Sequence, residues 1–276
     1  MKYLILLTAG FIMIIQGGQA QSPDEARLAV HYKFSHVQDT NNRDNPYREN
    51  MVLLVGKRCS LYKSFDRRVE QKSTTNPDGT VRTDTRGFGS LEEYYQFPVE
   101  NELVMKDNIH SVPPPMTDLI SFIIPGPLPE INWHITGDTT SFGGLHCQKA
   151  TTHFKGRDYT AWFCPELPIH VGPWKLNGLP GIILDAHDNR REVQFIFDGI
   201  NKVDSTVIQI PEKGIRTTDK EFARLEETVR KDPQAYLKLV MAQGVDYNGP
   251  RPSIRFDSKP MPGFAFNNPI ELPETK

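Results

Sequence analysis

The chain has 276 residues, and 32 Lys and Arg stand against 34 Asp and Glu, giving a formal net charge of −2. The absence of a basic excess excludes a protein that binds nucleic acid through a positively charged surface. Charged residues make up 24% and apolar residues 38% of the chain, which is typical of a folded protein rather than a disordered or fibrous one.

The first twenty residues have the pattern of a signal peptide. Lys2 supplies positive charge, residues 3–15 are apolar, and Gly18 and Ala20 place small residues before Gln21. The apolar run is shorter than the ~20 residues of a membrane-spanning helix. We therefore predict cleavage after Ala20, with no transmembrane segment afterwards. The product would be exported, either periplasmic or associated with the outer envelope, where disulfides are permitted.

Residues 21–276 are predicted to form a single β-rich domain with an extended C-terminal tail over residues 250–276. Polar residues 71–90 contain an Asn-Pro-Asp-Gly sequence, which indicates a long loop or a wide hairpin. Further on, the pattern predicts two hairpins. The first pairs 146–154 with 159–164 around a loop at 155–158, and the second joins 182–184 to 193–197.

The hydrophobic period changes towards the end of the chain. Residues 218–221 (Thr-Asp-Lys-Glu) form a capping box before a helix whose apolar face carries Phe222, Leu225 and Val229. A second helix is predicted from Pro233, which suits a first helical position. Because strands come first and helices last, we predict an α+β fold that is mainly β. The expected form is a curved antiparallel sheet or half-barrel with two late helices packed on it.

The segment before residue 188 is rich in glycine, proline and tryptophan. The sequence from Leu179 predicts a type II turn, in which Pro180 fixes one φ angle and Gly181 supplies a positive φ. Gly178 would let the backbone pass close to a neighbour, and Trp174 is large enough to cap a core. Two interpretations stay open: a packing motif, or a ligand-facing turn formed by these five residues.

Residues 177–183 (Asn-Gly-Leu-Pro-Gly-Ile-Ile) resemble the motif that names the GLPGLI family. The resemblance implies an exported protein of Gram-negative type with no established biochemical activity, and it brings no catalytic residues. The chain departs from the family pattern at Ile182-Ile183, where Leu-Ile is usual, and at Cys164, where a polar residue is expected. Similar family elements are Cys147–Thr151, Gly156-Arg157, Ala161–Phe163, Pro165–Ile169, Gly172–Lys175 and the ending Asn268–Leu272.

The three cysteines pose a separate question. Cys147 and Cys164 lie on the two arms of the first predicted hairpin and could form a disulfide that closes a loop of 18 residues. Such a bond would stabilise the fold by roughly 3 kcal/mol. Counted from the centre of the predicted loop the two are offset by two residues, so pairing would need a bulge or an asymmetric loop. Cys59 would then remain as a small buried residue. A cysteine nucleophile is the alternative, but no protease signature surrounds any of the three.

Metal and cofactor motifs are weak. Asp185 and His187 share one face of a predicted strand and are the candidate metal ligands. No HExxH, Walker, GxSxG or dinucleotide-binding motif is present, and no cofactor is predicted. We therefore predict a non-catalytic binding or accessory module of the cell envelope, whose concave apolar sheet face takes an unknown ligand or an envelope protein. The alternative is a periplasmic metal-binding protein or a metal- or thiol-dependent enzyme.

Overall fold

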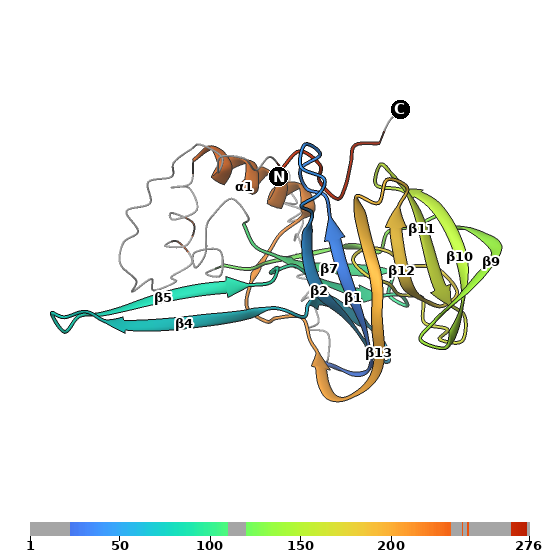
Figure 1. The fold of residues 1–276 in the computed structure, drawn as a ribbon, viewed down its shortest axis with the longest axis horizontal. Helices are drawn as coiled ribbons and strands as arrows, with labels where there is room; N and C mark the ends of the chain where they lie inside the picture. The colour runs from blue at the N-terminus through green and yellow to red at the C-terminus, as the bar shows by residue number, and fades with distance from the viewer. Residues whose placement is uncertain (1–22, 110–119, 233–238, 240–241, 243–265, 275–276) are drawn as a thin grey trace, which may run out of the picture.

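One large β-sheet dominates the chain (Figure 1). The computed structural model describes residues 23–109, 120–232, 239, 242 and 266–274. Twelve strands are hydrogen-bonded in the order β14-β8-β7-β6-β3-β2-β1-β13-β12-β11-β10-β9. Their bounds are β1 (Asp24–His36), β2 (Tyr47–Val55), β3 (Ser60–Ser64), β6 (Glu93–Phe97), β7 (Glu102–Asp107), β8 (Phe122–Pro127), β9 (His134–Phe142), β10 (Leu145–Phe154), β11 (Arg157–Cys164), β12 (Ile182–Asp188), β13 (Val193–Ile208) and β14 (Ile215–Arg216).

The mainly β character is confirmed, but the sheet is mixed rather than wholly antiparallel. Ile215 and Arg216 of β14 pair in parallel with Phe122 and Ile123 of β8, whereas the other described neighbours are antiparallel. The sequence missed this pair because two residues are too few to show a strand period. The half-barrel curvature stays a prediction.

The helix α1 (Asp219–Lys231) begins at the predicted capping box. The Thr218 hydroxyl accepts a hydrogen bond from the Glu221 amide at 3.3 Å, and the Glu221 carboxylate accepts from the Thr218 amide at 3.2 Å. Phe222 and Val229 are buried, and the Phe222 ring packs on Phe122 of β8 at 5.2 Å. The predicted second helix from residue 233 lies almost entirely outside the described residues. So do the signal peptide and residues 250–265 of the predicted tail.

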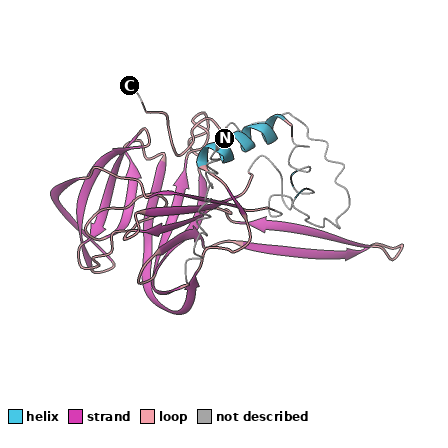
Figure 2. Cartoon of the chain, turned by 180° about the vertical axis from the view of Figure 1, so that it is seen from behind, coloured by secondary structure: helices cyan, strands magenta, loops and turns pink. Residues whose placement is uncertain are grey.

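Strands β4 (Arg68–Thr75) and β5 (Val81–Phe88) form a separate two-stranded hairpin. It extends away from the large sheet in both ribbon views (Figures 1 and 2). The Asn76 amide donates to the Thr80 carbonyl at 2.8 Å, and Gly79 has a φ of +82°. The wide-hairpin interpretation of residues 71–90 is therefore confirmed.

The sheet buries apolar residues on both faces, because side chains alternate along each strand. On β1 and β2, Val30 and Leu53 pack into a large core on the first face, which also contains Trp174. Their chain neighbours Ala29 and Val52 belong to a smaller core on the second face. Residues 165–181, between β11 and β12, supply much of the first core and are called the motif segment below. No helix in the described part of the chain is long and apolar enough to cross a membrane.

Candidate functional site

The motif segment is built into the first core. Trp174 is 2% exposed and Leu179 1%, and Gly181 is also buried, whereas Gly178 and Pro180 reach the surface. The Trp174 ring contacts three rings of β10, β11 and β13, at centroid distances of 5.8–6.4 Å. These burial values favour the packing interpretation, because a ligand could meet only two of the five predicted residues.

A buried glutamine, which the sequence did not single out, holds the motif segment on the sheet. Gln96 of β6 is fully buried. Its side-chain nitrogen lies 3.2, 2.9 and 3.2 Å from the carbonyl oxygens of Gly172, Trp174 and Leu176. These carbonyls have no strand to bond with, and the two hydrogens of the amide are shared among them inside the core. Sequence alone gave no signal, since Gln96 is one polar residue within a short strand.

The two glycines of the turn have the opposite roles to those predicted. Gly178 has the positive φ, +87°, and open space around it. At Gly181 an added Cβ would lie 2.1 Å from the Cys164 carbonyl oxygen, so this glycine permits the close backbone approach. The predicted type II turn is wrong as well. The Gly181 amide donates to the Leu179 carbonyl at 2.8 Å, which makes a three-residue turn centred on Pro180.

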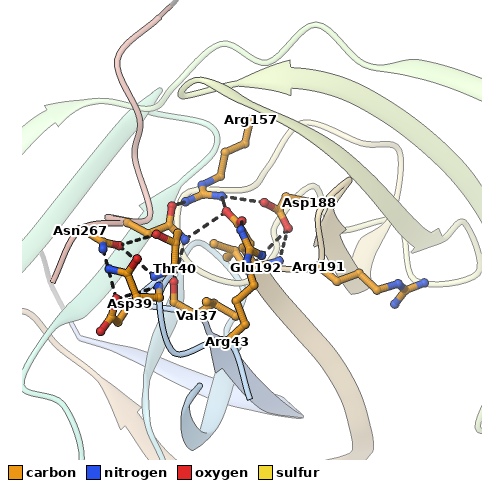
Figure 3. Close-up of polar contacts among 12 residues, drawn as sticks. Val37, Asp39, Thr40, Arg43, Arg157, Asp188, Arg191, Glu192 and Asn267 are labelled. Carbon is orange, nitrogen blue, oxygen red and sulfur yellow. Dashed lines mark hydrogen bonds and ion pairs between the residues drawn. The ribbon is translucent and has the colours of Figure 1, made fainter. Parts of the chain in front are cut away.

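The strongest polar cluster surrounds Arg157, the first residue of β11 (Figure 3). Its side chain is 2% exposed, and those of Asp188 and Glu192 are each 1% exposed. The guanidinium donates from Nη1 to Asp188 Oδ2 at 2.7 Å and to Glu192 Oε2 at 3.1 Å. Two carboxylates around one guanidinium would leave a buried negative charge, but Arg43 adds a second cation at 2.6 Å from Glu192. The cluster is therefore balanced in charge.

The same arginine binds the C-terminal tail. Its Nη2 donates to Asn268 Oδ1 and to the Pro269 carbonyl, both at 2.7 Å, and its Nε donates to the Ile270 carbonyl at 2.9 Å. Further along, Glu271 accepts from Lys175 of the motif segment at 2.6 Å. Two stretches that carry the family resemblance, one near residue 157 and one at 268–272, thus meet in space. The sequence marked both but gave no sign of their contact.

We expect acid to detach the tail. Burial would raise the pKa of Glu192, but hydrogen bonds from Arg43, Arg157 and Asn268 outweigh it and hold the pKa below its ordinary value of 4.5. Burial likewise raises the pKa of Glu271, but Lys175 and Lys155 together outweigh it and hold the pKa below its ordinary value. A depressed carboxyl pKa stabilises the fold above about pH 4.5, and that stability is lost as the pH falls through the folded pKa.

Thermal unfolding between pH 6 and pH 3 would measure this loss. Tm should fall most steeply below about pH 4.5. Buried His36, which contacts the Asn268 carbonyl at 2.8 Å, adds a loss of the same sign below about pH 6.5, because burial lowers its pKa. The variant Glu271→Gln should show a shallower acid transition than the wild type. A Tm that stays constant down to pH 3 would contradict this prediction.

Asp185 and His187 lie together on β12 but form only a pair. His187 Nδ1 is 3.8 Å from Asp185 Oδ1, and Asp185 Oδ2 accepts from the Phe197 amide at 3.2 Å. Within the described ranges no group of three or more His, Cys, Asp or Glu is arranged to hold a metal ion. A metal site in a protein normally needs three or four such ligands. The metal alternative therefore gains no support from the described residues.

All three cysteines are buried, and no disulfide joins them in this structure. Burial raises the pKa of Cys59 to about 12, with the neighbouring Asp24 carboxylate as the next cause. Burial also raises the pKa of Cys147 to about 12. A nucleophilic cysteine needs a lowered pKa and access to substrate, so these environments disfavour the thiol-enzyme alternative.

A groove of about 600 Å³ lies on the second face of the sheet, opposite the motif segment. Ala29, Val52 and Leu54 of β1 and β2 form its floor and are themselves buried. Leu91 and Val203 add apolar walls. This volume falls within the range of roughly 300–1,000 Å³ that small-molecule sites occupy. The groove was not predicted residue by residue, because its lining comes from strands far apart in the sequence.

The rim of the groove is polar and includes a cation that forms no ion pair with another described residue. Both oxygens of Glu93 are occupied, Oε1 by Lys106 at 2.8 Å and Oε2 by the Tyr95 hydroxyl at 2.5 Å. Lys63, opposite Glu93 on β3, is half-buried and has no described ion pair in the part of the chain that the structure covers. The groove therefore combines an apolar floor with an available ammonium group.

Comparison with known proteins finds a similar fold among solved structures and a family model that matches part of the sequence. No curated protein sequence matches the chain. Two solved structures of PNGF-II, in space groups P21 and C2, are similar to this chain. In both the TM-score is 0.53 at 12% identity, over 74% of this chain and 34% or 33% of PNGF-II. The chain thus spans about one third of the length of PNGF-II, and at this identity the likeness concerns the fold alone.

Residues 153–185 match a family model described as a protein of unknown function (Porph_ging). This stretch contains β11, the motif segment and the first half of β12. It therefore includes Arg157, Trp174 and Gly181, whose contacts fix the motif segment and the tail. The match confirms the predicted resemblance to a GLPGLI-type family, over residues 153–185 of this chain.

Proposed function

We propose that this protein is an exported, non-catalytic binding or accessory module of the cell envelope, and that its ligand occupies the groove on the second face of the sheet. The single observation that carries the proposal is the groove itself, about 600 Å³ with a buried apolar floor. Export rests on the signal-peptide pattern of residues 1–20.

The lining favours an amphipathic ligand with an anionic group. Apolar floor residues would take a hydrocarbon portion, at about 25 cal/mol for each Å² removed from water. Lys63 would meet the anionic group, since it is the rim cation without a described ion pair. Phe65, which is 61% exposed at the same rim, would fold its ring over the apolar portion. Fatty acids and related lipids have this chemistry.

Titration of the purified protein with cis-parinaric acid, a fluorescent fatty acid, tests the proposal. We expect saturable binding near one equivalent. The variant Lys63→Glu should raise Kd at least tenfold, because it removes the cation and adds a second carboxylate beside Glu93. The variant Leu91→Trp should also weaken binding, by filling the groove without changing its charge.

The variant Lys57→Glu is the matched control, because it makes the same charge reversal at an exposed turn outside the groove lining. Its Kd should stay within twofold of the wild type. No saturable binding by the wild type would overturn the proposal. So would equal Kd values for the wild type, Lys63→Glu and Leu91→Trp, since the probe would then bind elsewhere.

A further inference from the structure

Cys147 and Cys164 occupy opposing positions on β10 and β11. The two strands pair from Phe154 with Arg157 to Gln148 with Phe163, without any shift in register. One further step along the same register places Cys147 opposite Cys164. The sequence predicted an offset of two residues because it assumed a four-residue loop. That loop has only two residues, Lys155 and Gly156, both with positive φ.

The hydrogen-bond pattern of the hairpin makes this position suitable for a cross-strand bond. A two-residue turn closes with a hydrogen-bonded pair, here Phe154 with Arg157. The two kinds of pair then alternate along the ladder, and seven steps lead to a non-hydrogen-bonded pair at the cysteines. Cα atoms in such pairs are about 4.5 Å apart, within the roughly 4.4–6.8 Å that a disulfide requires.

The side chains already meet. Cys147 is 2% exposed and Cys164 fully buried, and both belong to the first core. The Cys164 thiol is a close enough neighbour to help raise the pKa of the Cys147 thiol. Cys59 is remote from them, since it belongs to the core on the second face and its thiol donates to Asp24 at 3.7 Å. The three cysteines therefore divide into one adjacent pair and one separate residue.

We propose that Cys147 and Cys164 form a structural disulfide in the exported protein, and that Cys59 stays a free thiol. The bond would join β10 to Cys164, whose backbone packs against Gly181 of the motif segment. Each thiol loses one proton and one electron to form the S–S bond, and a disulfide oxidant such as oxidised glutathione is reduced to two thiols. The exchange takes place while the hairpin forms, because thiols buried in a closed core are out of reach of the oxidant.

Refolding of the purified protein in vitro tests this pairing without depending on export or on ligand binding. The protein is unfolded with guanidinium and dithiothreitol, refolded in reduced and oxidised glutathione, and alkylated under denaturing conditions. We expect one alkylated cysteine, Cys59, and a linked peptide pair containing Cys147 and Cys164. Reduction should raise the count to three and lower Tm by about 6–12 °C.

Variants separate the bond from the packing of each side chain. Cys147→Ala, Cys164→Ala and the double variant should all lose the dependence of Tm on dithiothreitol, whereas Cys59→Ala should keep it. If an alanine variant does not fold, the peptide map of the wild type still decides the question. Three alkylatable thiols in the refolded wild type, or a linked peptide containing Cys59, would overturn the proposal.

Discussion

Replacement of Arg157 by methionine is expected to lower the free energy of unfolding by about 3–5 kcal/mol. The change leaves the buried carboxylates of Asp188 and Glu192 without their shared guanidinium. It also removes the donors for Asn268, Pro269 and Ile270 of the tail. Methionine keeps the unbranched shape and most of the volume, so the loss reports on charge and hydrogen bonding. Urea unfolding of wild type and variant would measure it.

Arg191 provides a matched control on the turn between β12 and β13, beside Glu192. Its side chain is exposed and points away from the cluster in Figure 3. Arg191→Met should therefore change stability by less than about 0.5 kcal/mol. Limited proteolysis should also cut the tail of Arg157→Met before it cuts the tail of the control. If Arg157→Met and Arg191→Met have equal stability, Arg157 does not hold the tail in the way proposed.

Replacement of Gly181 by alanine is expected to cost about 3 kcal/mol, and to lower Tm by about 6–12 °C. The added Cβ would lie 2.1 Å from the carbonyl oxygen of Cys164 and 2.5 Å from its carbonyl carbon. These are backbone atoms at the end of β11, so neither can move aside by changing a rotamer. Because Gly181 lacks a positive φ, the cost comes from the contact alone. Thermal unfolding would measure the change.

Two other glycines separate the contact from backbone strain. Gly178→Ala meets open space but must keep a φ of +87°, so we expect a cost of about 1–2 kcal/mol. Gly137→Ala on β9 meets open space at an ordinary φ and should be almost neutral. If Gly178→Ala lowers the stability more than Gly181→Ala, the close backbone approach lies at Gly178 and the positive φ at Gly181, as the sequence suggested.

Local signals in the sequence predicted the elements that depend on neighbouring residues. The capping box at Thr218 and Glu221 needs only backbone groups three residues away. The hairpin of β10 and β11 likewise follows from alternation on both sides of a short polar turn. The mainly β fold could be predicted for the same reason.

Contacts between distant residues could not be predicted. A polar residue such as Gln96 gives no sign that it bonds carbonyls some 80 positions later. The sequence also could not divide two glycine roles between Gly178 and Gly181, because either position allows a positive φ or a close approach. The predicted two-residue offset between Cys147 and Cys164 was wrong for a different reason, since the register of the hairpin depends on the number of residues in its turn.

The place of β1 in the sheet has a consequence for how the chain folds. β1 is the first described strand, yet it lies in the interior of the sheet, between β2 and β13. Its partner β2 follows at once, but β13 begins only at Val193, and the tail residues that accept hydrogen bonds from Arg157 come later still. During synthesis β1 therefore keeps one open edge until most of the chain is available. Such long-range pairing slows folding and exposes an edge to aggregation, so truncation before β13 should yield insoluble protein.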